Sequence, residues 1–326
     1  MPEASNGDVV IHHETFGDPA DPALLMVNGL GSQCVAYRTE WCARFAAEGF
    51  FTIRFDNRDV GLSTHLSEVT PDVAATTAAV ASGRTPLVPY LLEDMARDAV
   101  AVLDALGIGR AHVMGLSMGG MIVQQLALDH PHRLRSMTTV MSSTGDPDVG
   151  QASAEARVLL FGPPATDRDG AIARSVEGLR TWGSPGHQDD ERTAAIVGEA
   201  FDRSFDPAGQ ARQLMAILAS PSRTKALGQV SVPALVMHGD QDRLVDISGG
   251  RRTAEAIPGA RFEVLEGMGH DYPPAYWDRW VQLVAEHARA ADLAAAGTER
   301  SPLTEHQRRA GRRDGLRRVG GDELVG

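Results

Sequence analysis

Short runs of apolar residues recur along the chain and alternate with segments of helical periodicity. Each run is rich in Val, Ile, Leu and Met and has few polar positions, which is typical of strands buried on both faces of a parallel sheet. The pattern predicts six such strands, at residues 23–29, 50–56, 111–117, 137–143, 234–240 and 262–267. Residues 9–17, with the sequence VVIHHETFG, alternate instead, and we expect them to form an opening antiparallel strand.

Three segments between these runs predict helices. The first, residues 92–107, ends at Gly107. The second, residues 118–131, is stopped by Pro131, and the third spans about 275–291. The apolar residues of the first segment share one helical face: Met95, Ala99, Val102, Leu103 and Leu106.

Residues 144–220 interrupt the alternation, because they contain no convincing strand. Gly/Pro-rich breaks separate helical patches such as RTAAIVGEAFDRS and AGQARQLMAILAS. An interval of this kind between two core strands is where a lid over an active site is inserted, and a structural helical layer without a role in substrate binding is the alternative. We therefore divide the chain into a core, residues 1–143 and 221–291, and a helical insertion, residues 144–220.

Composition and charge narrow the class of protein. The 326 residues are 43% apolar and 23% charged, which is typical of a globular protein with one large or two smaller domains. The net charge of −12 argues against nucleic acids and acidic membranes as partners, because phosphate groups attract a basic surface. No apolar run reaches the length of a membrane span, and the N-terminus lacks the pattern of a signal peptide, so we expect a cytoplasmic protein. Residues 292–326 become alanine-rich and then arginine-rich, which predicts a disordered basic tail.

The cysteines and histidines form no recognisable metal motif. Cys34 and Cys42 are too few for a disulfide framework, so we expect two buried thiols, with a disulfide between them as the alternative. The HHE sequence at 12–14 lies in the alternating strand, and the chain has neither H-E-x-x-H nor a Cys/His cluster. We therefore expect no metal and no cofactor.

The sequence GLSMG, residues 115–119, matches the G-x-S-x-G pattern around a nucleophilic serine. This pattern can occur by chance in a chain with 34 glycines, so its context decides. Ser117 ends a predicted strand and begins a predicted helix, which is the context of a nucleophile elbow. Glycines at 115 and 119 fit such a turn, because neighbouring backbones come too close for side chains. We predict that Ser117 is a nucleophile.

A serine nucleophile needs a base and a third group that orients the base. When the three follow in the order Ser, Asp, His, the acid and the base each come after a strand. This chain has Asp242 after the strand PALVMHG and His270 after the strand RFEVLEG. Asp240 is the alternative acid, although we expect it to bind the N–H groups of its own turn. Asp146, which follows an earlier strand, is a further candidate.

The oxyanion of such a reaction needs two hydrogen-bond donors. We expect the N–H of Met118 to be one and the N–H of Leu30, in the loop after the strand ALLMVNG, to be the other. The loop sequence NGLGS is rich enough in glycine for its backbone to face a substrate, so Asn28 and Gly29 are expected substrate-binding residues, together with Trp182 of the insertion. Large apolar residues of the insertion either line an apolar pocket or form its own core: Phe161, Trp182, Phe201, Phe205 and Met215.

On these motifs the chain resembles the serine α/β hydrolases over about residues 9–290. VNGLGS stands where that family usually has His-Gly, and FDNRDVGLS stands where it usually has Asp-x-Arg-Gly-x-Gly-x-Ser. HVMGLSMGG, HGDQD and GMGHD complete the set in the family's order. The resemblance implies an α/β-hydrolase fold, with a mostly parallel eight-stranded sheet, helices on both faces and a helical lid, and a triad of Ser117, Asp242 and His270.

Two residues depart from the family pattern. Asn28 replaces the customary histidine before the oxyanion-loop glycine, and we expect its side chain to hydrogen-bond across the loop. Asp59 replaces a usual glycine after Arg58. We expect Asp59 to pair with Arg58 and Arg58 to be structural.

Within the family the chain is most similar to the aclacinomycin methylesterase type, which removes a methyl ester from a polyketide. This similarity implies hydrolysis of a carboxylic ester through an acyl-enzyme, with a small-molecule ester or lactone as the partner. Enol-lactone hydrolysis and perhydrolysis use the same triad and stay open as alternatives. A ligand-binding protein of this fold without catalysis is a further alternative, although the intact triad and oxyanion loop argue against it.

Overall fold

The predicted apolar runs pair into one sheet of eight strands in the computed structural model, which describes residues 3–299. In chain order these are β1 (Glu3–Asn6), β2 (Val9–Phe16), β3 (Ala23–Val27), β4 (Phe51–Phe55), β5 (Ala111–Leu116), β6 (Leu134–Val140), β7 (Ala234–Gly239) and β8 (Arg261–Leu265). Their order in the sheet is β1-β2-β4-β3-β5-β6-β7-β8. β2 pairs antiparallel with β1 and β4, and the remaining neighbours are parallel. The predicted fold class, with its antiparallel opening strand, is confirmed.

Two strands differ from the sequence prediction. β6 begins at Leu134 and ends at Val140, three residues before the expected span at each end. β1 was not predicted, because its four residues, EASN, carry no apolar alternation. Backbone pairing with β2 forms this edge strand, so its side chains give little signal.

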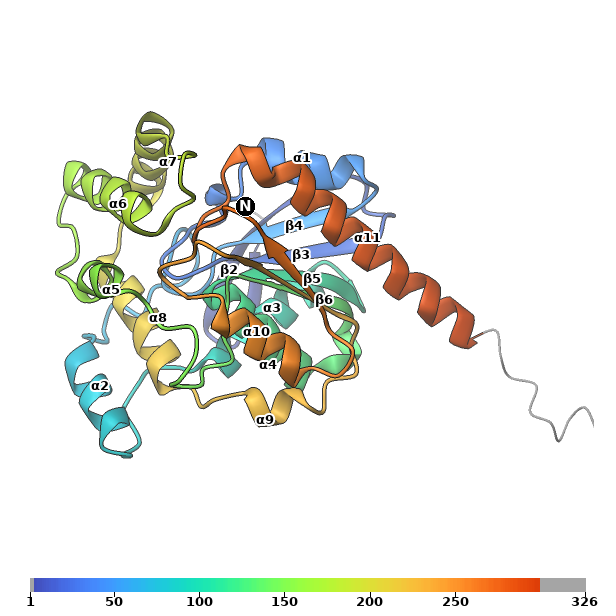
Figure 1. The fold of residues 1–326 in the computed structure, drawn as a ribbon, viewed down its shortest axis with the longest axis horizontal. Coiled ribbons are helices and arrows are strands. Elements are labelled where there is room, and N and C mark those ends of the chain that lie inside the picture. The colour runs from blue at the N-terminus through green and yellow to red at the C-terminus, as the bar shows by residue number, and fades with distance from the viewer. Residues whose placement is uncertain (1–2, 300–326) are drawn as a thin grey trace, which may run out of the picture.

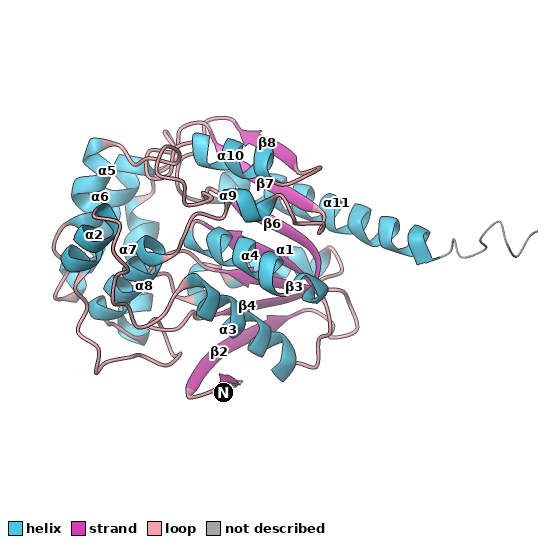
Figure 2. Cartoon of the chain, turned by 90° about the horizontal axis from the view of Figure 1, so that it is seen from below, coloured by secondary structure: helices cyan, strands magenta, loops and turns pink. Residues whose placement is uncertain are grey.

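Helices cover both faces of the sheet (Figures 1 and 2). The β3 side chains alternate: Leu24 and Met26 pack into one core layer, and Leu25 and Val27 pack into the other. The first layer lies under α1 and α11, and the second lies under α3 and α4. The helical elements outside residues 144–220 are η1 (Cys34–Ala36), α1 (Thr39–Ala47), α2 (Val73–Ala81), α3 (Leu92–Ala105), α4 (Met118–Asp129), η2 (Pro131–Arg133), α9 (Thr224–Leu227), α10 (Ser248–Ala256) and α11 (Pro274–Glu299).

Four helices and no strand lie within residues 144–220, and α9 follows them before β7. They are α5 (Ala154–Phe161), α6 (Arg168–Trp182), α7 (Asp190–Arg203) and α8 (Pro207–Ala219). A Ser or Asp side chain accepts a backbone hydrogen bond at the start of each, which stabilises the first turn: Ser153, Asp167, Asp189 and Asp206. These helices gather with α2 at one end of the molecule (Figure 1), and α2 packs against α8. We keep residues 144–220 as the proposed boundaries of this insertion.

The C-terminal helix is longer than expected. α11 continues to Glu299, so residues 292–299 of the predicted disordered tail are helical. This part of the sequence, DLAAAGTE, is rich in alanine, the residue with the highest helix propensity. Residues 300–326, with the arginine runs, lie outside the described residues. Neither α11 nor any other described helix is long and apolar enough to cross a membrane.

Cys34 and Cys42 are both buried and both free, which confirms the expectation of two buried thiols. Cys34 lies at the start of η1, and Cys42 lies on α1. Burial raises the pKa of both thiols, to about 12 for Cys42, so neither is a reactive thiolate at neutral pH.

The loop after β4 is held by two buried ion pairs, and the expected pairing of Asp59 with Arg58 is wrong. Arg58 instead donates two hydrogen bonds to Asp98 of α3, at 2.6 and 2.7 Å. Asp59 accepts from Arg212 of α8 at 2.7 Å and from the Tyr90 hydroxyl at 2.6 Å. Asp59 has a φ of +70°, so its side chain turns away from that of its neighbour and reaches α8. Arg58 is structural, as expected.

Removing the carboxylate of Asp98 should destabilise the fold strongly. Asp98→Ala leaves the buried Arg58 guanidinium without its partner, and we expect the free energy of unfolding to fall by about 3–5 kcal/mol. The matched control is Asp202→Ala, which breaks an exposed pair with Arg168 and should leave the free energy of unfolding nearly unchanged. Denaturant titration of both variants tests this, and equal losses would contradict an anchoring role for the Arg58–Asp98 pair.

Candidate active site

Ser117 occupies a strained turn between β5 and α4. Its φ is +53° and its ψ is −120°, a conformation that non-glycine residues seldom adopt. The turn is held from both sides, because the Ser117 N–H donates to the Val140 carbonyl at 2.9 Å and the Ser142 hydroxyl donates to the Ser117 carbonyl at 2.8 Å. The side chain therefore projects from the carboxyl end of a central strand, at the start of a helix.

Glycines on either side of Ser117 make this turn possible. A Cβ atom at Gly115 would lie 2.2 Å from the Gly119 carbonyl oxygen, and one at Gly119 would lie 2.0 Å from the Val27 carbonyl oxygen. Both distances are far below van der Waals contact, so no side chain fits at either position. The G-x-S-x-G pattern follows from the packing of α4 against β5 and β3.

The structure brings the three predicted triad residues together. His270 Nε2 lies 3.0 Å from Ser117 Oγ, and His270 Nδ1 lies 2.7 Å from Asp242 Oδ2. With the Nδ1–H donating to Asp242, Nε2 is left unprotonated and faces the serine hydroxyl. The Asp242 side chain is fully buried, and the His270 side chain is 8% exposed.

Asp242 is fixed by its own loop and by a second imidazole. Its Oδ1 accepts from the N–H groups of Leu244 and Val245, both at 2.9 Å. His238 Nε2 donates to the Val245 carbonyl at 2.8 Å and lies 3.3 Å from Asp242 Oδ2. Burial alone would raise the pKa of Asp242, but the charge of His270 and hydrogen bonds from both imidazoles lower it to about 2. The carboxylate is therefore ionised at neutral pH.

The two alternative acids lie elsewhere. Asp240 accepts from the Gly267 N–H at 2.8 Å, so the expectation that it binds the N–H groups of its own turn is wrong. That role belongs to Asp242, whose side chain turns inward while Asp240 is exposed. Asp146 binds the Thr224 hydroxyl at 2.7 Å and forms an ion pair with Arg252, with no hydrogen bond to His270.

The loop after β3 lies directly against the nucleophile. A methyl group added at Gly29 would lie 3.3 Å from Ser117 Cβ and 3.9 Å from Ser117 Oγ. Among the hydrogen bonds of the described residues, none uses the Leu30 N–H. The Met118 N–H belongs to the first turn of α4, where N–H groups have no partner within the helix. The two expected oxyanion donors therefore come from segments that flank Ser117.

Asn28, predicted to bind substrate, is 1% exposed and faces the inside of its loop. Its Nδ2 donates to the Gln33 carbonyl at 3.0 Å, which is the hydrogen bond across the loop that we expected. Its own carbonyl accepts from Asn57 Nδ2 at 3.1 Å. The burial of Asn28 assigns its side chain to bracing the loop, because no surface is left for a ligand.

Trp182 contacts the loop that carries His270 through its backbone. Its carbonyl accepts from the His270 N–H at 2.6 Å, and its ring packs over Gly178 of its own helix. The next residues continue this contact: the Ser184 hydroxyl donates to Asp271 and accepts from the Gly269 N–H at 2.9 Å. Burial raises the pKa of Asp271, and the hydrogen bonds from Ser184 offset this only in part. The end of α6 thus holds the loop that carries His270.

Sequence reasoning missed the polar residues that tie α7 and α8 to the loop after β3. Gln213 of α8 accepts from the Gly31 N–H at 2.8 Å, and Arg203 of α7 donates to Gln33 at 2.8 Å. Gln33 in turn donates to the carbonyls of Ala200 and Ser204, both at 2.7 Å. A weak signal was present, because Arg212 and Gln213 are adjacent polar residues in the predicted helical patch AGQARQLMAILAS.

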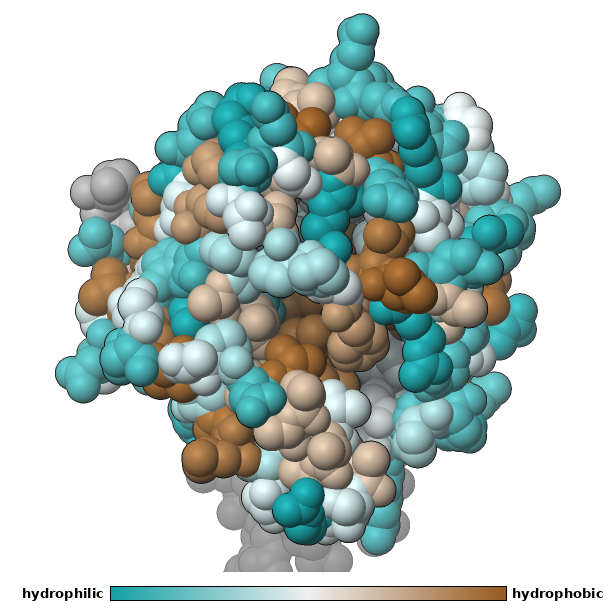
Figure 3. Space-filling view, turned by 90° about the vertical axis from the view of Figure 1, so that its left-hand side faces the viewer, coloured by the Kyte–Doolittle hydropathy of each residue, from teal (hydrophilic) through white to brown (hydrophobic). Residues whose placement is uncertain are grey.

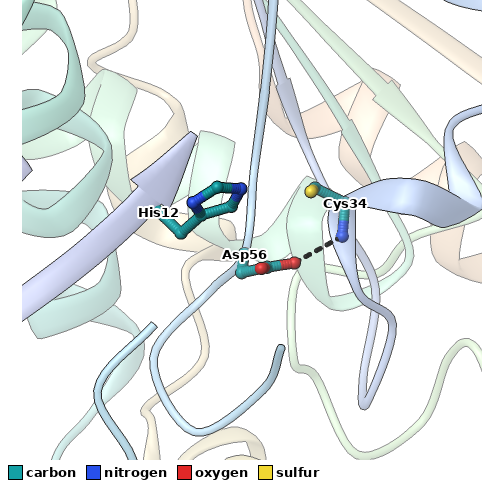
Figure 4. A group of neighbouring side chains, drawn as sticks. All are labelled: His12, Cys34 and Asp56. Carbon is teal, nitrogen blue, oxygen red and sulfur yellow. Dashed lines mark hydrogen bonds between the residues drawn. The ribbon is translucent and has the colours of Figure 1, made fainter. Parts of the chain in front are cut away.

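His12, Cys34 and Asp56 come together near the start of η1 (Figure 4), a cluster that the sequence did not indicate. Asp56 accepts from the Cys34 N–H at 2.6 Å. The Arg203 guanidinium also lies 2.7 Å from Asp56 and 3.6 Å from the Cys34 sulfur. This guanidinium already neutralises the carboxylate, and the thiol is protonated, so the donor set does not suit a cation.

The end of the molecule formed by α2 and α5–α8 is hollowed near its middle, and apolar side chains gather around the hollow (Figure 3). Large apolar side chains of these helices, and of the loop between α7 and α8, are exposed: Val80 at 43%, Val158 at 73%, Phe161 at 47% and Phe205 at 39%. The rings of Phe201 and Phe205 pack at a centroid distance of 4.3 Å, so part of this set forms the core of the insertion.

A sequence profile of the alpha/beta hydrolase fold matches residues 22–272. The match covers most of the chain and agrees with the sheet order and the elbow at Ser117. The chain belongs to the alpha/beta hydrolase family and is a hydrolase. The resemblance inferred from the motifs is confirmed.

The chain is also similar to individual proteins with a known activity or a solved structure. The chain is 31% identical to rhodomycin D methylesterase DauP of Streptomyces sp. (strain C5), over 88% of this chain and 97% of that protein. It is 27% identical to 3-oxoadipate enol-lactonase 2 of Acinetobacter baylyi, over 79% of this chain and 86% of that protein. Among solved structures, an enol-lactonase from Burkholderia xenovorans has a TM-score of 0.67 at 24% identity, covering 88% of this chain and 99% of its own.

The low pKa of Asp242 predicts how stability depends on pH. Folding lowers this pKa from 3.8 to about 2, so the ionised carboxylate stabilises the fold above about pH 4, and this contribution is lost as the pH falls towards 2. A shift of this size corresponds to about 2 kcal/mol. We expect the difference in unfolding free energy between wild type and Asp242→Asn to shrink by that amount between about pH 4 and pH 2. Denaturant titrations across this range test it, and a difference independent of pH would contradict it.

Proposed function

We propose that the protein hydrolyses a carboxylic ester through a covalent acyl-enzyme on Ser117. The observation that carries this proposal is the chain of hydrogen bonds from Ser117 Oγ through His270 to Asp242, at 3.0 and 2.7 Å. A serine hydroxyl becomes a nucleophile only when a base removes its proton, and His270 Nε2 lies where that proton leaves.

In the proposed mechanism Ser117 attacks the ester carbonyl while His270 takes the serine proton. Asp242 holds the imidazole in the required tautomer and stabilises its positive charge. The N–H groups of Leu30 and Met118 donate to the oxyanion, where each such donor contributes about a hundred- to thousandfold in rate. His270 then protonates the leaving alcohol, and water releases the acid by the same sequence of steps. No step needs a cofactor.

A methyl ester on a largely apolar acyl group is the substrate class that we propose. DauP, at 31% identity across nearly its full length, is by name a methylesterase, and this supports the choice. Apolar side chains gather around the hollow at the insertion end (Figure 3) and offer apolar surface for such an acyl group. Phe161 and Phe205 are exposed apolar side chains of the insertion. We further propose that residues 144–220 cap the site and limit access of water.

Enol-lactone hydrolysis is the second candidate. The enol-lactonase relative from Acinetobacter baylyi favours it, because a lactone is an ester whose alcohol and acid stay joined. The same Ser117 chemistry would open the ring. The two candidates differ only in the shape of the substrate that the capped site accepts.

Kinetics on matched aspartate variants test the mechanism. Asp242→Asn removes the group that orients His270, and we expect kcat to fall by about 10⁴-fold on p-nitrophenyl and methyl esters. Asp240→Asn changes an exposed residue two positions away whose amide still accepts from Gly267, so activity should stay close to wild type. His270→Ala should lose about 10⁴–10⁶-fold.

The same assay compares linear methyl esters with an enol lactone at equal concentration. Higher kcat/KM on the methyl esters supports the proposed substrate class, and the reverse order supports the lactonase alternative. A wild-type protein that cleaves no ester or lactone, or an Asp242→Asn variant as active as Asp240→Asn, would contradict the proposed function.

A further inference from the structure

Gln213 is a fully buried amide on α8 that no step of the proposed mechanism uses. Its Oε1 accepts from the Gly31 N–H at 2.8 Å, and its Nε2 donates to the Arg58 carbonyl at 2.7 Å. One face of the amide accepts and the other donates, so rotation by 180° would place two donors together and two acceptors together. The orientation of this side chain is therefore fixed.

The groups on either side of Gln213 are held in place. Arg58 is anchored to Asp98 by two hydrogen bonds, at 2.6 and 2.7 Å. α8 also approaches the loop closely, because a Cβ atom at Gly31 would lie 2.9 Å from the side chain of Gln210, three residues before Gln213 on the same helical face. Gln213 thus connects the loop after β3 to the loop after β4 through a helix of the insertion.

The residue that Gln213 holds lies inside the turn that presents the oxyanion donor. The Ser32 N–H donates to the Gly29 carbonyl at 3.3 Å, which closes a four-residue turn. Gly31 is the third residue of this turn and has a φ of +68°, as a type II turn requires. Because peptide groups are planar and trans, the Leu30 N–H points opposite to the Gly29 carbonyl and away from the turn's interior.

Type I and type II turns differ by a flip of the central peptide, here the one between Leu30 and Gly31. The hydrogen bond from the Gly31 N–H to Gln213 holds this peptide in its type II orientation and anchors the turn to α8. The Leu30 N–H belongs to the preceding peptide, so Gln213 acts on it through the position of the whole turn. We propose that Gln213 is a positioning residue for the oxyanion hole: by anchoring the Gly29–Ser32 turn to α8 through the Gly31 N–H, it fixes the position of the Leu30 N–H relative to Ser117. The inference rests on the proposed function, because it assigns a cause to the geometry of that site.

Two substitutions at this position separate positioning from structural support. Gln213→Met keeps the length of the side chain and loses both hydrogen bonds, so we expect kcat to fall by about ten- to a hundredfold with little change in KM. Gln213→Glu keeps an oxygen that accepts from Gly31 but buries an acid against the Arg58 carbonyl. The Glu variant should therefore be less stable than the Met variant and yet more active.

The matched control is Gln124→Met. Gln124 is another fully buried amide, on α4, and it binds Arg223 and Thr253 rather than the loop after β3. Its replacement should lower thermal stability without a comparable loss of kcat. A phenylboronic acid, which binds a catalytic serine as a tetrahedral anion, supplies a second readout: its Ki should rise in Gln213→Met by the same factor as kcat/KM falls.

An activity order that follows stability, with the Glu variant below the Met variant, would overturn the positioning role. So would equal kcat losses in Gln213→Met and Gln124→Met. If these variants behave alike while Asp242→Asn is inactive, the inference fails and the proposed function stands. If wild type hydrolyses no ester and binds no boronic acid, the proposed function fails and the inference fails with it.

Discussion

The backbone of Ser117 is the constraint on which the rest of the site depends. A non-glycine residue at a φ of +53° costs roughly 1–3 kcal/mol and persists only where its surroundings over-determine it. Here β5 lies between β3 and β6 in the sheet, and α4 packs so closely on β5 and β3 that Gly115 and Gly119 have no room for a side chain. The turn places Ser117 at the carboxyl edge of the sheet, where the loops after β3, β7 and β8 also begin. This edge is where open α/β sheets bind their ligands.

The helices between β6 and β7 contact the loops that flank Ser117 as well as covering the end of the molecule. α8 holds the loop after β3 through Gln213, and the end of α6 holds the loop after β8 through the Trp182 carbonyl and Ser184. Buried polar groups of this kind are costly when unpaired, so the insertion and the core specify each other's positions. The insertion therefore contacts the loops on two sides of Ser117, the loop after β3 and the loop that carries His270.

The fold could be predicted from the sequence because its sequence patterns are local. Buried strands appear as apolar runs, and the nucleophile elbow appears as a serine between two glycines. The order of Asp242 and His270 after their strands followed from the same reasoning. The expectations that proved wrong depend on the direction of the backbone or on partners that are distant in the sequence. Asp59 binds Arg212 rather than Arg58 because its φ is positive. Asp242, and not Asp240, binds the backbone N–H groups of its own turn. Gln213 reads only as a polar position in a helix, since its partners lie more than 150 residues away in the chain.

The central claim is that Ser117 is the residue that attacks the substrate, and covalent labelling tests it most directly. Wild type and Ser117→Ala are treated with a fluorophosphonate, which reacts with a serine only where a base and an oxyanion hole activate it. Digestion and mass spectrometry then locate the adduct. The account predicts one phosphonate per wild-type chain, on the peptide that contains Ser117, and none on the Ser117→Ala variant. An adduct on another residue, or equal labelling of the two proteins, would contradict the account.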